Sequence, residues 1–201
     1  MPRDAADTRQ RLVIEGRRLF ASNGVHATSL KSVVEAAGQR NTSALHYHFG
    51  GRDGLLAAIL DEHNESIEAA RRLMLDDDSV APSLAHFVDA VIVPQVSMLA
   101  DPHGRAFLSI VSQLSDLFDR WEEGGTPEQA MRAFLGIKSL LPAGLTDAER
   151  HERVTRFLEL VSQALGSRAR QIDSGRTPSL DHDAWVHNLA VMATGALSAS
   201  G

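Results

Sequence analysis

The sequence predicts an all-α protein, with a three-helix helix-turn-helix domain at the N-terminus and a larger helical domain after it. Apolar residues recur three and four positions apart through most of the 201-residue chain, which is the spacing of one buried helix face. No segment shows the alternation that indicates a strand, and no internal repeat is visible. The fourth helix is predicted to begin at residue 52, so we place the domains at 1–51 and 52–201.

The first helix of the N-terminal domain is predicted to end at Asn23-Gly24, because Gly24 can adopt the left-handed conformation that closes a helix. Thr28 and Ser29 can then supply a side-chain oxygen to the free amides of the second helix. The second helix is followed by a tight turn at Gly38. The residues expected in the buried stripes of these two helices are Leu12, Val13, Gly16, Leu19, Phe20, Leu30, Val33, Val34 and Ala37.

The third helix is predicted to run from about Arg40 to His46, with Ala44 and Leu45 facing inward and Phe49 as the central plug of the domain. In helix-turn-helix proteins, the helix after the tight turn enters the major groove of DNA. Its polar side chains can donate to and accept from base edges, and arginine and asparagine suit bidentate pairing with guanine and adenine. These side chains are Gln39, Arg40, Asn41, Thr42 and Ser43.

Further candidate DNA contacts flank the third helix. Tyr47 and His48 are expected near the sugar-phosphate backbone. Arg52 opens the fourth helix, where free amides and a positive charge both favour a phosphate. The complete set of predicted DNA-binding residues is Thr28, Ser29, Lys31, Gln39, Arg40, Asn41, Thr42, Ser43, His46, Tyr47, His48 and Arg52.

Residues 8–60 resemble the DNA-binding domain of the tetracycline-repressor (TetR) family. Nine residues separate Gly38 from His48-Phe49, where the family usually has eight, and Gln39-Arg40 stand where it often has Val-Ser. Which of Gln39, Arg40 and Asn41 contacts a base therefore stays open. The shared features, in chain order, are Leu19-Phe20, Gly24, Ala27-Thr28-Ser29, Ala36-Ala37-Gly38, Tyr47-His48-Phe49, and Arg52-Asp53 before Leu55-Leu56.

The charge distribution also favours nucleic-acid binding by the N-terminal domain. The chain has a formal net charge of −6, but residues 1–55 hold eight basic and five acidic side chains, against 12 and 21 in the remainder. A positive end on a negative body steers that end towards phosphate. Because one weakly basic domain would bind too loosely to be specific, we expect a homodimer on a pseudo-palindromic double-stranded DNA operator.

The sequence does not support several other classes of protein. It has no cysteines, no signal-peptide layout and no apolar run long enough to span a membrane, so we expect a cytoplasmic protein without disulfides. The nine histidines show no metal-ligand spacing, and the nucleophile-elbow, phosphate-loop and dinucleotide motifs are absent. We therefore predict no enzyme activity, no metal and no cofactor.

Proline and capping residues predict the helix boundaries in the rest of the chain. Pro94 is expected to kink or break the helix in which it lies. Asp101-Pro102 is expected to begin a further helix, and Thr126-Pro127 another, with Thr126 as its cap.

The last two helices are the longest clear helical patterns after the N-terminal domain. Thr146 and Glu149 form a capping box at the start of the first of them. The family resemblance implies that these helices pair with their copies in an intermolecular four-helix bundle, which would make the protein a homodimer. The alternative is that their apolar stripes pack only within the chain. The stripes comprise Val154, Phe157, Leu158, Val161, Leu165, Trp185, Leu189, Met192, Ala193 and Ala196.

The resemblance also implies that residues 52–201 form a ligand-binding and dimerisation domain. As a set, several side chains suggest a mostly apolar cavity with a few polar groups, which would suit a small lipophilic effector. Any one of them, taken alone, is more often an ordinary core residue. The candidates are His63, Phe87, Val91, Met98, His103, Phe107, Val111, Leu114, Met131 and Phe134.

The hypothesis that unites these patterns is a sequence-specific DNA-binding transcriptional regulator, a repressor released from its operator by a small lipophilic ligand. The ligand would act by tilting the fourth helix, which is expected to pack into both domains. Two alternatives stay open: an activator with the same architecture, and a helical adaptor whose N-terminal domain binds protein. Binding that weakens steeply with salt would favour DNA over a protein partner.

Overall fold

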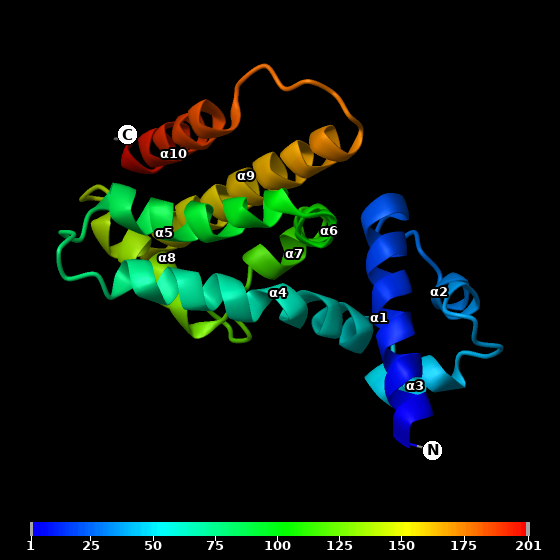
Figure 1. Ribbon diagram of the computed structural model, residues 1–201. Coiled ribbons are helices and arrows are strands. Elements are labelled where there is room, and N and C mark those ends of the chain that lie inside the picture. The colour runs from blue at the N-terminus through cyan, green and yellow to red at the C-terminus, as the bar shows by residue number, and fades with distance from the viewer. Residues whose placement is uncertain (1, 200–201) are drawn as a thin grey trace. The chain divides into compact units, whose positions relative to one another are not determined.

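Figure 1 shows the computed structural model, which describes residues 2–199; within this range, the side chains of residues 2–5, 115 and 117 are not described. All regular secondary structure in this range is helical, which confirms the predicted all-α class. Contacts divide the chain into two compact units, Met1–Asn64 and Glu65–Gly201, which we call the first and second units. The predicted domain boundary after residue 51 separates DNA binding from ligand binding, and it stays a prediction. The helix α4 (Arg52–Leu75) contributes residues to both compact units.

The first unit has the arrangement of helices that the sequence predicts. The residues expected in the stripes of its first two helices are buried, except for Leu30, which is half-buried. They share the core with Leu45, Leu55 and Ile59, which are fully buried. Helical spacing therefore accounts for most of this core. The helices are α1 (Pro2–Asn23), α2 (Leu30–Ala36), α3 (Ser43–Phe49) and the first part of α4.

A glycine allows α1 and α4 to approach each other closely. A Cβ atom added at Gly16 would lie 3.0 Å from Leu55 Cδ2 and 3.2 Å from Ile59 Cδ1. Contacts this short leave little room for any side chain at this position. Gly16 therefore belongs to the core by virtue of its small size.

Two hydroxyl side chains organise the connection between α1 and α2. Gly24 has a φ of 101° and follows the end of α1, as predicted. Ser29 Oγ accepts a hydrogen bond from Ser32 N at 3.0 Å and caps α2, which confirms the predicted cap. Thr28 Oγ1 instead donates to the carbonyls of Leu19 and Gly24, at 3.1 and 2.8 Å. Thr28 thus fastens the end of α1 to the start of α2 from inside the unit.

The third helix begins and ends three residues later than predicted. Asn41 Oδ1 accepts a hydrogen bond from Ser43 N at 2.9 Å, which satisfies a free amide at the helix start and keeps residues 39–42 in the turn. Gly50 has a φ of 73° and closes the helix after Phe49. The prediction of a third helix was right in type, and its placement from Arg40 to His46 was wrong.

The central plug of the first unit is Leu45 rather than Phe49. Leu45 is fully buried, whereas Phe49 and Ala44 are half-buried. The Phe49 ring lies under the Arg9 guanidinium, with 5.3 Å between Cζ and the ring centroid. Because a cation over an aromatic face is favourable, this position suits a side chain at the rim of the core. The late start of α3 turns Leu45 inward and moves Phe49 to the end of the helix.

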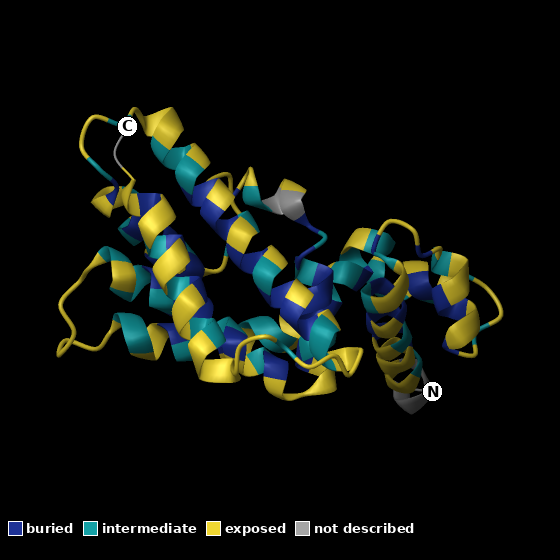
Figure 2. Cartoon of the chain, turned by 90° about the horizontal axis from the view of Figure 1, so that it is seen from above, coloured by how far each residue is buried: buried dark blue, intermediate teal, exposed yellow. Residues whose placement is uncertain are grey.

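The second unit is a helical bundle in which α9 packs against α6, α8 and α10, and α5 packs against α8 and α10 (Figure 1). Residues on the facing sides of these helices are buried, and those on the outer sides are exposed (Figure 2). Its elements, after the second part of α4, are α5 (Leu84–Val96), η1 (Ser97–Ala100), α6 (Pro102–Val111), α7 (Ser115–Phe118), α8 (Glu128–Leu140), α9 (Asp147–Asp173) and α10 (His182–Ser198).

Most of the predicted boundaries in the second unit are present. Asp101 caps α6 by accepting from His103 N at 2.8 Å, and the capping box at the start of α9 is formed. The break at Pro94 is displaced: α5 continues to Val96 and then tightens into the 3-10 helix η1. Proline removes one backbone donor, so the helix loses a hydrogen bond near its end without terminating there.

The predicted cap of α8 was wrong. Thr126 Oγ1 donates to the carbonyl of Trp121 at 2.8 Å and does not accept from α8. The free amides are satisfied from α4, because Glu68 accepts from Gln129 N at 2.7 Å and from Ala130 N at 3.1 Å. A carboxylate at a helix N-terminus is favoured by both hydrogen bonding and the helix dipole.

Arg71 extends this contact to a third helix. Its guanidinium pairs with Glu68, and its Nε donates to the carbonyl of Ala90 on α5 at 3.0 Å. Arg71 is almost fully buried, and this burial lowers its pKa, while the Glu68 carboxylate acts in the opposite direction. The Glu68–Arg71 pair therefore connects α4 to both α5 and α8 inside the second unit.

Candidate nucleic-acid interface

The predicted DNA-binding residues of the first unit fall into three groups by exposure. Thr28 is 3% exposed, and its hydroxyl is used within the unit. Gln39, Thr42, His48 and Arg52 are half-buried. The exposed members are Ser29, Lys31, Arg40, Asn41, Ser43, His46 and Tyr47.

One face of α3 is polar and exposed. Ser43, His46 and Tyr47 stand at positions i, i+3 and i+4, which lie on the same side of a helix. Leu45 lies in the core and anchors the helix to the rest of the unit. Tyr47 is 84% exposed, which is unusual for a large aromatic side chain. This face has hydrogen-bond donors, acceptors and an aromatic ring, which can contact base edges in the major groove.

The turn before α3 contains the two side chains that were expected to pair with bases. Arg40 is exposed and makes no hydrogen bond or ion pair with any described residue. Asn41 uses its carboxamide oxygen to cap α3, so only its amide protons are available for another partner. A bidentate contact to adenine needs both groups, and Asn41 cannot make it while it caps the helix.

Two of the basic side chains already have partners within the unit. Arg52 donates to the carbonyl of Val25, and its guanidinium lies 5.8 Å from the centroid of the Phe20 ring. Its charge remains at the first turn of α4, but a direct phosphate contact would require it to leave the Val25 carbonyl. Lys31 lies 3.7 Å from Glu35 in an exposed pair, which costs little to open.

The predicted ligand-binding residues are distributed over several helices. His63 belongs to the first unit, and the others belong to the second. Val91, Phe107, Leu114 and Phe134 are buried, whereas Phe87, Met98, Val111 and Met131 are half-buried. His103 is exposed on the first turn of α6. Four of the candidates lie on α5 and α8, two helices that pack together. These are Phe87, Val91, Met131 and Phe134.

A hollow of about 530 Å³ opens on the second unit between the end of α4, the following loop, α5 and α8. Its size is in the range of small-molecule sites, and Phe87 is the one predicted residue among its lining. Hydrogen bonds from the Ser79 hydroxyl and amide lower the pKa of Asp77 at its rim. The lining residues are Leu75, Asp77, Asp78, Val80, Ala81, Pro82, His86, Phe87, Arg132 and Leu135.

The outer face of α9 and α10 carries exposed apolar residues, of which Met192 belongs to the predicted stripes and Val191 and Leu160 do not. The α9 stripe is buried within the chain, as the alternative reading of the sequence expects. On α10, by contrast, Val191 is 55% and Met192 54% exposed, and Leu160 on α9 is also exposed. A second hollow, of about 320 Å³, lies between these two helices. It is lined by Glu152, Arg153, Arg156, Phe157, Leu160, Ala193, Ala196 and Leu197.

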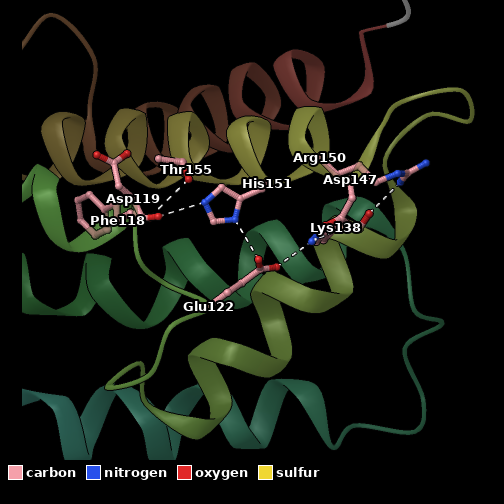
Figure 3. A network of polar contacts seen from close by, with 8 residues as sticks. All are labelled: Phe118, Asp119, Glu122, Lys138, Asp147, Arg150, His151 and Thr155. Atoms are coloured by element: carbon pink, nitrogen blue, oxygen red, sulfur yellow. Dashed lines mark hydrogen bonds and ion pairs between the residues drawn. The ribbon is translucent and has the colours of Figure 1, made fainter.

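A polar network that the sequence analysis did not identify joins the segment after α7 to α8 and α9 (Figure 3). His151 contacts the Glu122 carboxylate and the Asp119 carbonyl, both at 3.1 Å. Lys138 bridges Glu122 and Asp147, at 2.8 Å from each. The His151 ring also stacks on buried Trp121, with 5.4 Å between centroids. The charged side chains of this network pair with one another, and these contacts hold the segment after α7 against α8 and α9.

Acidification is expected to weaken this network. The hydrogen bond from Lys138 lowers the pKa of Glu122, with a further contribution from His151, and Lys138 also lowers the pKa of Asp147. A carboxyl group with a lowered pKa in the folded state stabilises the fold above its unfolded pKa. This stability is lost as the pH falls through the lowered value. Thermal unfolding followed between about pH 5 and pH 3 should therefore show a falling midpoint.

The variant Lys138→Met should flatten this pH dependence and lower the midpoint at pH 7 by about 2 °C. Lys31→Met is the matched control, because Lys31 makes only an exposed pair on α2. The assignment would be contradicted by equal pH profiles for wild type and Lys138→Met.

Neither a metal site nor a membrane span is found in the described part of the chain. Among these residues, no group of three or more histidine, aspartate, glutamate or cysteine side chains is placed to hold a metal ion. No helix within residues 2–199 combines the length and the apolar character needed to cross a bilayer.

Comparison with known sequences bears on the first unit most directly. The sequence model of the family described as bacterial regulatory proteins, tetR family, matches residues 13–59. An uncharacterized HTH-type transcriptional regulator of Mycobacterium tuberculosis is 30% identical over 127 residues, which cover 57% of this chain and 66% of that protein. The HTH-type transcriptional regulator TtgR of Pseudomonas putida is 30% identical over 79 residues, 39% of this chain and 37% of TtgR. The chain thus spans just under two thirds of the mycobacterial relative.

Solved structures match the whole fold at low sequence identity. NalD of Pseudomonas aeruginosa, described as the secondary repressor of the MexAB-OprM multidrug efflux pump, has a TM-score of 0.59 and 18% identity. The match covers 99% of this chain and 100% of that chain. A TetR-family transcriptional regulator from Rhodococcus sp. has a TM-score of 0.54 and 16% identity, over 96% and 100% of the two chains. At these identities the comparison establishes the fold.

Proposed function

Because the chain belongs to the TetR family of bacterial regulatory proteins, we propose that it binds a DNA operator and regulates transcription. Proteins of this family are regulators rather than enzymes. The observation that carries the proposal is the polar, exposed face of α3, held by Leu45 in a helix-turn-helix unit. The proposal places the protein in the cytoplasm, where bacterial DNA lies.

The proposed DNA-bound form is a homodimer on a pseudo-palindrome. Two copies would place their α3 helices in successive major grooves, about 34–36 Å apart. The proposed dimer contact is the outer face of α9 and α10, on which Leu160, Val191 and Met192 are exposed. Apolar side chains gathered on one face of two neighbouring helices favour association with another such face.

The proposed regulatory step is release of the operator when a small lipophilic molecule binds the second unit. The hollow beside Phe87 and the neighbouring side chains of α5 and α8 support this part of the proposal. Since α4 continues from one unit into the other, a shift of its second part would alter the placement of α3. The ligand changes DNA occupancy only through its difference in affinity for the two arrangements. NalD, which has a similar fold, is described as a repressor of an efflux pump.

Two alternatives are distinguished by measurement. An activator would bind DNA in the same way but raise transcription, which a reporter assay with the operator detects. A protein-binding adaptor would show no salt-sensitive binding to DNA, whereas neutralising phosphates makes affinity fall steeply as salt rises. Selection from a random duplex pool, followed by fluorescence anisotropy of the enriched and scrambled sequences at several salt concentrations, tests the proposal. If no sequence is enriched even at low salt, the DNA-binding proposal is wrong.

Arg40→Ala should weaken binding to the enriched sequence by about tenfold and weaken binding to scrambled DNA little, if Arg40 contacts a base. Arg72→Ala is the matched control, because Arg72 is an exposed arginine of the second unit outside the proposed interface. Equal losses on both duplexes from Arg40→Ala would place Arg40 on the phosphate backbone instead.

A further inference from the structure

His46 occupies the middle of the exposed face of α3. Ser43 precedes it by one turn and Tyr47 follows it directly, and all three side chains are exposed. If the proposed function is right, this face enters the major groove, where the side chains of a recognition helix contact base edges. The inference below rests on that function and concerns the chemistry of one contact.

The Gly50 carbonyl favours one tautomer of the neutral His46 imidazole. Nδ1 lies 3.3 Å from the carbonyl oxygen of Gly50. A carbonyl oxygen only accepts hydrogen bonds, so in the neutral imidazole Nδ1 must be the donor. Nε2 then carries a lone pair and acts as an acceptor, and it has no hydrogen-bond partner among the described residues.

Gly50 holds the carbonyl in this position. Its φ of 73° is a left-handed conformation that side chains rarely adopt, and it closes α3 immediately after Phe49. The Gly50 amide also donates to the carbonyl of His46, at 2.9 Å. Two hydrogen bonds therefore join the same pair of residues, one through the backbone and one through the imidazole.

We propose that His46 recognises one base of the operator by accepting, at Nε2, a hydrogen bond from an exocyclic amino group. In the major groove only cytosine N4 and adenine N6 offer such a donor, whereas guanine and thymine present acceptors there. A phosphate offers only hydrogen-bond acceptors, and in this tautomer Nε2 is also an acceptor. The two groups therefore cannot form a hydrogen bond. The Gly50 carbonyl thus directs His46 towards an amino-bearing base rather than towards the DNA backbone.

The test deletes single groups from the bases of the enriched operator. At each position of one half-site, adenine is replaced by purine and cytosine by 2-pyrimidinone, which lack the amino group. In a second series, adenine and guanine are replaced by their 7-deaza analogues, which lack the N7 acceptor. Anisotropy titrations at pH 8 compare the full-length wild type with His46→Ala.

At one position, loss of the amino group should weaken binding of the wild type by about tenfold and weaken binding of His46→Ala little. His26→Ala is the matched control, because His26 is an exposed histidine of the same unit outside the proposed interface, and it should behave as the wild type does. If His46→Ala folds poorly, the wild-type titrations still test the proposal, because they show whether any amino deletion weakens binding.

Three outcomes would overturn the inference. The first is a His46-dependent loss on 7-deaza substitution, which would make Nε2 a donor. The second is an equal loss on every duplex, which would mark a phosphate contact. The third is wild-type binding that no amino deletion weakens. Failure of the proposed function has a different appearance, because the pool selection would then yield no enriched sequence to substitute.

Discussion

Replacing Val191 by aspartate is expected to split the proposed dimer and to weaken operator binding by at least about a hundredfold. Val191 is 55% exposed on α10, next to Met192 in the sequence, and α10 packs against α9, on which Leu160 is also exposed. A carboxylate buried at this contact without a partner would lose its hydration, which costs several kcal/mol, of the order of 3 or more. Each monomer would then bind its half of the operator independently. It would lose the high effective concentration that the second DNA-binding unit of a dimer provides.

Analytical ultracentrifugation gives the mass of the variant, and anisotropy gives its affinity for the operator. Leu73→Asp is the matched control, because Leu73 is also an apolar residue of the second unit, 77% exposed on α4 and outside this face. It should leave both measurements unchanged. A Val191→Asp protein that remains a dimer would show that the contact lies on another surface.

Leu45→Ala is expected to have the largest effect on the first unit. Leu45 is fully buried and is the main anchor of α3, a helix of seven residues. Truncating a buried leucine costs about 2–5 kcal/mol, and a small unit has little stability to lose. The variant should therefore lose DNA binding while the second unit stays folded.

Hydrogen exchange resolved by peptide separates the two units in this experiment. Exchange should accelerate over α1, α2 and α3 and remain slow over α9. Ile14→Ala provides the comparison, because Ile14 lies in the same unit with 41% of its surface exposed and should cost much less. If Leu45→Ala retained full protection and full affinity, Leu45 would not be the anchor of α3.

The sequence predicts the long helices well because their buried stripes repeat. The stripe of α1 needs no distant information, since Leu12, Leu19 and Phe20 identify one face by spacing alone. The short α3 shows the limit of this approach. Where α3 begins depends on whether the Asn41 carboxamide bonds to the Ser43 amide or to solvent. The pattern of polar residues in the sequence does not distinguish these two conformations.

Contacts between distant segments account for most of what sequence reasoning missed. Thr126 has the residue type of a cap, yet the amides of α8 are satisfied by Glu68 on another helix. Thr28 and Arg52 stay predicted DNA contacts, but the sequence did not indicate that their side chains bond to carbonyls of their own unit. Such partners become visible only when the folded chain brings them together. The polar character of the exposed face of α3 could be predicted, because polar residues lie next to the buried Leu45 in the sequence.

The link between Glu68 and the start of α8 sets a threshold for any effector of the second unit. A molecule that moves α8 away from α4 must break the two hydrogen bonds from Gln129 and Ala130 and leave a carboxylate partly unsolvated. One that moves both helices together keeps these bonds and transmits its displacement along α4. Under the proposed regulation, compounds that bind the second unit would therefore divide into inducers and silent ligands by whether they displace α4, and their affinity alone would not rank them.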